Sequence, residues 1–217
     1  MSFSNRIVII LFFALSYHIS YSQSPDKSLQ IRIDSVVSKL KKSQIDTICV
    51  YQGYCVGCFI TWKGIGGKCN YDGFYTTAYI LWKKVGVSYI TLLNSCFNYS
   101  TTKVVPNDLW TFCTGNIELI KSEAIKSFSI EQLQDGKKII VPIKVDHSYH
   151  EVVRLIIRNE ETTKYLDDYD FEKTNISGNK ANVNYEYNIN TKTWKLALLL
   201  NSCIHNRSHK LKFKKLA

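Results

Sequence analysis

The stretch "YTTAYILWKKVGVSYITLL", residues 75–93, decides the fold class of this chain. Two runs rich in Tyr, Ile, Leu and Thr, residues 75–83 and 88–93, flank the short segment "KKVG". Aromatic and β-branched residues are typical of strands, and a short loop that contains glycine is typical of a hairpin. The stretch therefore predicts two antiparallel strands joined by a tight turn.

Further strands are expected on both sides of this hairpin. The segment "KLKFKKL", residues 210–216, is typical of an edge strand because lysines guard it. Together with the hairpin, the strand-like residues 45–54 and 59–63 predict a β-meander. Further strands are expected at residues 139–145, 152–158, 164–166 and 183–187.

One amphipathic helix is expected near the beginning of the chain. The segment "SPD", residues 24–26, offers an N-cap, a proline for the first helical position and an acid for the first turn. Leu29, Ile33 and Val37 then recur at helical spacing, and lysines follow where a helix C-terminus favours cations. The pattern predicts a helix over residues 26–43.

Two later segments have helical composition. Residues 191–204 are rich in Leu and Ala, which predicts a buried helix, and residues 117–133 indicate another helix. The segment "NDLWTFCTGN" at residues 107–116, directly before the second of these helices, is expected to be a loop. We therefore predict an α+β fold, in which an antiparallel sheet of meander and hairpins carries two or three helices packed on one face.

The first 22 residues have the order of a secretory signal peptide. A single cation, Arg6, precedes an apolar core at residues 7–15, and small residues at 20 and 22 predict cleavage before Gln23. The apolar core is too short for a membrane span, which needs roughly 20 residues. The sequence predicts an exported protein, periplasmic or secreted, with no membrane span after cleavage and one domain at residues 23–217.

Three segments resemble uncharacterised exported proteins of Bacteroidota. They are the end of the leader, "SYSQ", then "YILWKK…SYITLLNSC", and later "NVNYEYN". The resemblance implies a bacterial envelope address. It brings no activity and no catalytic residues to transfer.

Six of the seven cysteines are predicted to form disulfides, because an oxidising compartment favours them. Four of them lie close together in a C-x5-C-x2-C-x10-C cluster, and two more can form a third pair. An odd cysteine count leaves at least one thiol over. The six candidates are Cys49, Cys55, Cys58 and Cys69 in the cluster, and Cys96 with Cys113.

Two alternatives stay open for the cysteine cluster. Its four thiolates could surround a zinc ion, although the second C-x2-C that usually completes such a site is missing. Cys55 and Cys58 could instead be a redox pair, although no helix follows them to lower the pKa of the first thiol. The protein could then be a thiol-redox or zinc-binding protein.

The charge of the chain is polarised. The formal net charge is +10, and residues 187–217 hold seven cations and no acid. Such an end could hold an anionic envelope component, such as lipid head groups or an acidic glycan, through Lys210, Lys212, Lys214 and Lys215. The preferred explanation of the charge is codon bias in an AT-rich genome, since lysines far outnumber arginines. Nucleic acid is not expected as a partner, and the sequence leaves open whether the partner is an anionic envelope component or another envelope protein.

The acidic run "YLDDYDFE", residues 165–172, could hold a calcium ion. It lacks the glycine and the distal glutamate of a calcium loop, so we expect a solvated turn. The sequence contains no G-x-S-x-G, phosphate loop or G-x-G-x-x-G. We therefore expect a binding or structural module without a cofactor, and an enzyme is the less favoured class.

Overall fold

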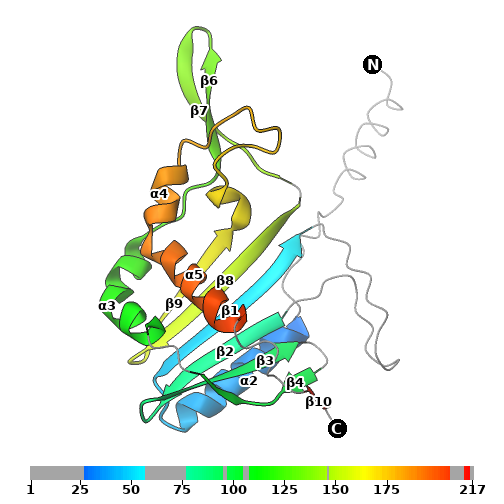
Figure 1. Ribbon diagram of the computed structural model, residues 1–217, viewed down its shortest axis with the longest axis vertical. Helices are drawn as coiled ribbons and strands as arrows, with labels where there is room; N and C mark the ends of the chain where they lie inside the picture. Colours follow the sequence, from blue (N-terminus) through cyan, green and yellow to red (C-terminus); the bar gives the residue numbers. More distant parts are fainter. Residues whose placement is uncertain are drawn as a thin grey trace, which may run out of the picture.

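The computed structural model describes residues 27–56, 77–94, 97–104, 108–145, 147–205 and 213–215. Helices and strands are both present, in an order that confirms the α+β class (Figure 1). In chain order they are α2 (Lys27–Lys42), β1 (Thr47–Val56), β2 (Thr77–Lys84), β3 (Val87–Asn94), β4 (Phe97–Tyr99), β5 (Thr102–Val104), α3 (Leu109–Ser122), β6 (Ser129–Gln134), β7 (Lys137–Pro142), β8 (Ser148–Ile157), β9 (Glu160–Asp167), the 3-10 helix η1 (Asp168–Phe171), α4 (Tyr185–Asn190), α5 (Lys192–His205) and β10 (Phe213–Lys215).

The main sheet is antiparallel and has eight strands. Its order is β10-β4-β3-β2-β1-β8-β9, and β5 also pairs with β3. The predicted hairpin is confirmed as β2 and β3, which meet at Val85 and Gly86, both with positive φ (47° and 76°). Two-residue turns of this kind match the twist of the strands they join. The central strand β1 pairs with β8, which lies about a hundred residues later in the chain.

Helices cover both faces of the sheet, rather than the single face that the sequence predicted. On one face, Ile48, Val50 and Ile80 form a core with apolar residues of α2. On the other face, Leu81 and Leu155 form a second core with residues of α3 and α5. Because β1, β2 and β8 are apolar on both sides, each side needs its own cover.

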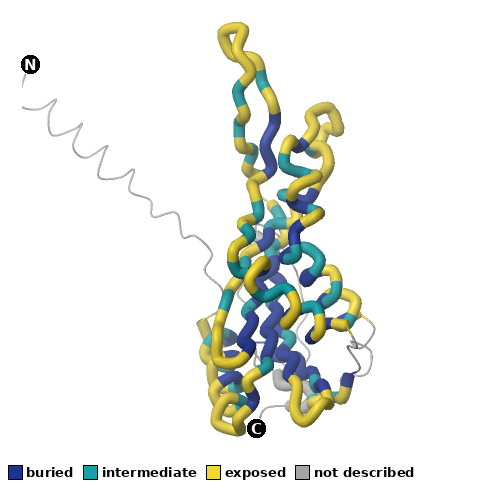
Figure 2. The backbone as a smooth tube through the Cα atoms, turned by 90° about the vertical axis from the view of Figure 1, so that its left-hand side faces the viewer, coloured by how far each residue is buried: buried dark blue, intermediate teal, exposed yellow. Residues whose placement is uncertain are grey.

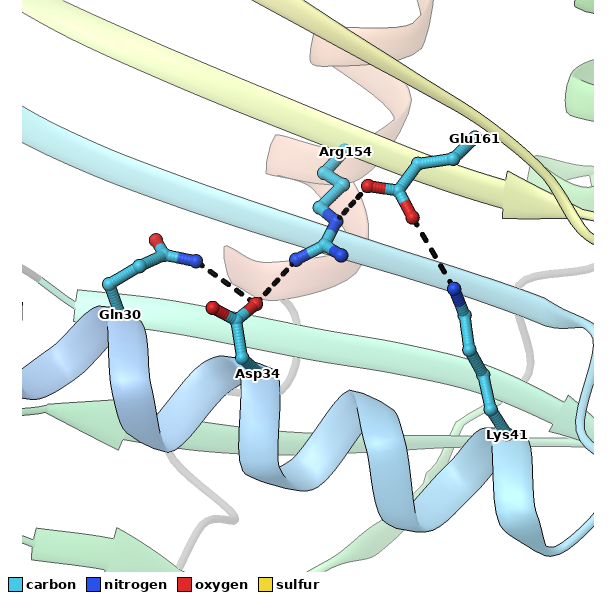
Figure 3. A network of polar contacts seen from close by, with 5 residues as sticks. All are labelled: Gln30, Asp34, Lys41, Arg154 and Glu161. Carbon is cyan, nitrogen blue, oxygen red and sulfur yellow. Dashed lines mark hydrogen bonds and ion pairs between the residues drawn. The ribbon is translucent and has the colours of Figure 1, made fainter.

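A polar network holds α2 against β8 and β9 (Figure 3). The Arg154 guanidinium lies 2.7 Å from Asp34 Oδ1 and 2.7 Å from Glu161 Oε1, and Lys41 Nζ lies 3.4 Å from Glu161 Oε2. Gln30 Nε2 donates to the same oxygen of Asp34 at 3.2 Å. Exposed ion pairs contribute little to stability, so the network mainly sets the position of α2 along the sheet.

Three local predictions are wrong. The expected loop at residues 107–116 contains the first turns of α3, and the expected helix at 117–133 ends at Ser122 and gives way to β6. The expected strand at 183–187 instead leads into α4. By contrast, the helices predicted at 26–43 and 191–204 are confirmed as α2 and α5.

The hairpin of β6 and β7 projects from one end of the molecule and is largely exposed (Figure 2). Its turn, Asp135–Gly136, has positive φ at both residues. Among the described residues, no helix is long and apolar enough to cross a membrane.

Candidate functional site

A cluster of tyrosine and acidic side chains lies where β1 ends and β8 begins, on the face covered by α5. We call it the Glu151 site and define it by Tyr51, Tyr149, Glu151, Asp168 and Asn201. In the β1–β8 ladder, Tyr51 is opposite Val153 and Gly53 is opposite Glu151. Alternate residues of a strand point to the same face, so these side chains share the face of the second core.

Gly53 makes room for the ring of Tyr149. A Cβ atom at position 53 would lie 1.6 Å from Tyr149 Oη and 2.6 Å from Tyr149 Cζ. The aromatic ring therefore lies over a glycine of the neighbouring strand, a position that any other residue would fill. The tyrosine itself is 41% exposed, so it forms part of the rim of the site.

Glu151 is the buried centre of the site, with 4% of its surface exposed. Its Oε1 accepts hydrogen bonds from the Tyr51 hydroxyl and from Asn201 Nδ2, the latter at 3.0 Å. Tyr51 Oη also lies 2.7 Å from Asn201 Oδ1. Glu151 Oε2 is buried and has no hydrogen-bond partner among the described residues. Buried polar atoms are almost always paired, so this oxygen calls for an explanation.

The electrostatics of the site are acidic. Burial, and then the charges of Glu151, Asp167 and Glu172, raise the pKa of Asp168 to about 6. Asp168 is nevertheless exposed, like Asn201. Water that reaches the carboxyl therefore screens it from the neighbouring charges. Asp168 therefore belongs to the exposed rim above the buried Glu151.

The tyrosines of the site stay protonated at neutral pH. Burial, followed by the charges of Glu151 and Asp168, raises the pKa of Tyr149 to about 12. The pKa of Tyr51 is raised further, first by burial and then by its hydrogen bond to Glu151. Both phenols are therefore neutral, and the negative charge of the site belongs to its carboxylates.

The acidic run at residues 165–172 is not the solvated turn that the sequence predicted. Asp167 begins η1 by accepting a hydrogen bond from Tyr169 N at 3.0 Å, and Asp170 accepts one from Phe128 N at 2.7 Å. Tyr169 and Phe171 of the same run are buried. The run thus anchors the end of β9 with two of its acids and leaves Asp168 beside Glu151.

Ser148, His150 and Asp167 meet on the opposite face of the same sheet end. Ser148 Oγ lies 3.0 Å from His150 Nε2, an approach that resembles a nucleophile and its base. In a catalytic triad, however, the carboxylate orients the imidazole. Here Ser148 Oγ donates to Asp167 Oδ2 at 3.2 Å, while His150 Nδ1 is 3.8 Å from that oxygen. The arrangement connects β8 to β9 and does not activate the serine.

Cys49 and Cys113 are free, buried thiols, which contradicts their predicted place in disulfides. The thiol of Cys203, on α5, joins them in the core of β1 and α3. Burial, and then the neighbouring Cys203, raise the pKa of Cys113 to about 12; burial, and then both other thiols, raise that of Cys49. Raised pKa values make thiols poor nucleophiles.

The strand geometry explains why Cys49 does not join the cysteine cluster. Cys49 and Cys55 both belong to β1, six residues apart, which is roughly 20 Å along a strand. Disulfide partners need Cα atoms within about 7 Å, and zinc ligands need a similar approach. The four-cysteine zinc site is therefore ruled out for a set that includes both residues. Cys55 itself is disulfide-bonded.

The other predicted disulfide residues, Cys58, Cys69 and Cys96, lie outside the described residues, so the rest of the framework stays a prediction. Within the described ranges, no group of three or more His, Cys, Asp or Glu side chains is arranged to hold a metal ion.

The predicted basic end lies at the other edge of the sheet from the acidic run. Lys214 and Lys215 belong to β10, which pairs with β4 at one edge, whereas β9 forms the opposite edge. Lys210 and Lys212 lie outside the described residues. The charge asymmetry of the sequence thus runs across the sheet.

Sequence reasoning missed Glu151 and its partners. The signal that could have found Glu151 is its place in "SYHEVVRLII", where alternation puts position 151 on the same face as Val153 and Leu155. A carboxylate at such a position is rarely buried without a specific reason.

No protein-family model, curated protein or solved structure matches this chain. The function of the Glu151 site is therefore argued from its geometry and chemistry.

Proposed function

We propose that this chain is an exported protein of the bacterial envelope that acts as a non-enzymatic binding module and takes a cationic ligand at the Glu151 site. The signal-peptide pattern supports export. The observation that carries the site is the buried Oε2 of Glu151, which lacks a partner among the described residues. A cationic donor would satisfy this oxygen and offset the negative charge around it.

The unsatisfied Oε2 of Glu151 lowers the stability of the folded protein. An unsatisfied buried polar group costs about 1–3 kcal/mol, and more when it is charged. Two donors hold the other oxygen in place, so the carboxylate is positioned, while Oε2 is unsatisfied within the described ranges. Residues that lower stability in this way are characteristic of binding sites, where function opposes stability.

Replacing Glu151 by glutamine tests this proposal. The amide keeps the shape of the side chain and an acceptor for Tyr51 and Asn201, but it removes the charge. We expect Glu151→Gln to raise the free energy of unfolding by about 1–2 kcal/mol, measured by urea denaturation at pH 7.

The matched control is Glu131→Gln on the β6–β7 hairpin. Glu131 is half-exposed and pairs with Lys138 at 2.7 Å, so its replacement changes stability by less than about 0.5 kcal/mol. If Glu151→Gln instead destabilised the protein, the charge of Glu151 would have a structural role and the proposal would be wrong.

The basic edge supports a separate proposal about a partner. Lys214 and Lys215 belong to β10, which pairs with β4 at one edge of the sheet, and a lysine-rich segment of this kind suits an anionic envelope component. Replacing Lys210, Lys212, Lys214 and Lys215 by glutamine should abolish salt-dependent binding to vesicles that contain anionic lipid. Unchanged vesicle binding by this variant would exclude the basic edge as the contact.

The thiol-redox alternative depends on Cys55 and Cys58, because the raised pKa values of Cys49 and Cys113 make those two thiols unreactive. Reduction of insulin disulfides by the purified protein, lost in Cys58→Ser, would support that alternative. Absence of this activity would remove it.

A further inference from the structure

We infer that the ligand of the Glu151 site is a substituted ammonium ion, an organic cation with an apolar part, rather than a metal ion. The inference rests on the proposed binding function and names its ligand class. It combines three properties of the site: two carboxylates, neighbouring tyrosines, and exposed residues next to the buried Glu151.

The acidic donors of the site suit an ammonium better than a metal. Its two carboxylates, Glu151 and Asp168, interact electrostatically, and its phenols stay protonated. Calcium takes six to eight oxygen ligands and magnesium needs octahedral coordination. An alkylammonium needs only one or two acceptors for its few N–H groups. Glu151 Oε2, which is unpaired within the described part of the chain, can provide them together with Asp168.

Three tyrosines lie near the carboxylate. Tyr51 donates to Glu151, and its cross-strand partner on the same face is Tyr79 of β2. Tyr149 lies over Gly53, and the charge of Glu151 helps to raise the pKa of its phenol. Faces of aromatic rings attract organic cations, most strongly where water is excluded. Carboxylate and tyrosine rings together are the chemistry that recognises an ammonium with attached carbon.

The exposed residues of the site indicate the side from which a ligand approaches Glu151. Asp168, Asn201 and Tyr149 are exposed and lie on three different elements, whereas Glu151 is buried. A cation that passes Asp168 reaches Glu151 Oε2, the oxygen that lacks a donor among the described residues. In the bound state its charge is paired with Glu151 and its apolar part contacts the rings of the rim.

Calorimetric titration of the full, exported protein tests the ligand class. The probes are n-butylammonium, which represents primary amines including a lysine side chain, choline, which represents quaternary amines, and calcium chloride at matched ionic strength. We expect saturable binding of at least one organic cation, weakened tenfold or more by Glu151→Gln.

A pair of variants at position 149 separates the ring from the hydroxyl. Tyr149→Phe keeps the aromatic face and should retain binding, while Tyr149→Leu should weaken it about threefold to thirtyfold, as expected for loss of a cation–π contact. Amide chemical shifts of residues on β1, β8 and α5 should move during the titration.

The outcomes distinguish failure of the ligand class from failure of the proposed binding function. Binding of calcium but of neither organic cation, lost in Glu151→Gln, would overturn the ligand class and leave the proposed function standing. Organic-cation binding that neither Glu151→Gln nor Tyr149→Leu weakens would place the site elsewhere. No binding of any probe, with no gain of stability in Glu151→Gln, would overturn both.

Discussion

Glu151 occupies a core-facing position of β8, yet one of its two carboxylate oxygens has no hydrogen-bond partner in the part of the chain that the structure describes. The two contacts on Oε1 come from residues 100 and 50 positions away in the chain. At the scale of single residues, the site is therefore a product of long-range pairing. No local pattern around position 151 specifies that Tyr51 and Asn201 will meet it.

Asp168 makes the stability of the folded protein depend on pH. Its pKa is raised from the usual value near 4 to about 6 in the folded state, so ionisation opposes folding. Protonated Asp168 stabilises the folded state fully below about pH 4, and this stabilisation is lost as the pH rises through about 6. Asp168→Asn should match the parent at pH 3.5 and exceed it by about 1 kcal/mol at pH 7, a figure reduced for solvent screening.

Urea denaturation of both proteins across this pH range measures the difference. Equal pH dependence of parent and variant would mean that Asp168 titrates as it does in the unfolded chain. Asp108→Asn serves as the control, because Asp108 lies before α3, which supplies none of the residues that define the Glu151 site.

At the scale of elements, α4 shows how a tertiary contact overrides a local pattern. The alternation at residues 183–187 predicted a strand, but Asn188 is fully buried and bonds to other segments. Its Nδ2 donates to Lys126 O and Asp170 O at 2.7 and 2.8 Å, and its Oδ1 accepts from Lys126 N at 3.0 Å. A helical turn brings this amide inward, and the partners that require it are distant in sequence.

Asn188→Ala tests this role of α4. The substitution leaves the N–H and the carbonyl of Lys126 without this partner, whereas Asp170 O keeps its hydrogen bond from Asn182 Nδ2. We therefore expect a loss of about 2 kcal/mol in the free energy of unfolding. The control is Asn190→Ala, since Asn190 is exposed and its Nδ2 donates to Glu186 O of its own helix. Equal stability of the two variants in urea denaturation would show that Asn188 does not hold these segments together.

At the scale of the whole molecule, the thiols divide into two groups. Cys49 and Cys113 belong to the core between β1, α3 and α5, whereas Cys55 lies at the other end of β1 and is disulfide-bonded. Redox compartment and spacing predicted disulfides for all three. Strand length and burial separate them, and neither could be deduced before β1 was known to run unbroken from Thr47 to Val56.

Alkylation with iodoacetamide at pH 7.5 measures this division. Because both are buried and have raised pKa values, Cys49 and Cys113 should resist labelling in the native protein. In urea without reductant both should be labelled, as located by peptide mass spectrometry. If labelling of either required a reductant, that cysteine would be in a disulfide, as the sequence predicted.

Local sequence by itself determined the elements whose periodicity is strong: the β2–β3 hairpin, the amphipathic helix α2, the apolar helix α5, and with them the α+β class. Backbone propensity and side-chain period are properties of neighbouring residues, so these elements can be read from short stretches. Only the tertiary structure decided that helices cover both faces, that α3 begins inside an expected loop, and that Glu151, Tyr51, Asn201 and Asp168 meet. Those outcomes depend on which distant strands pair, because pairing β1 with β8 fixes which side chains share a face.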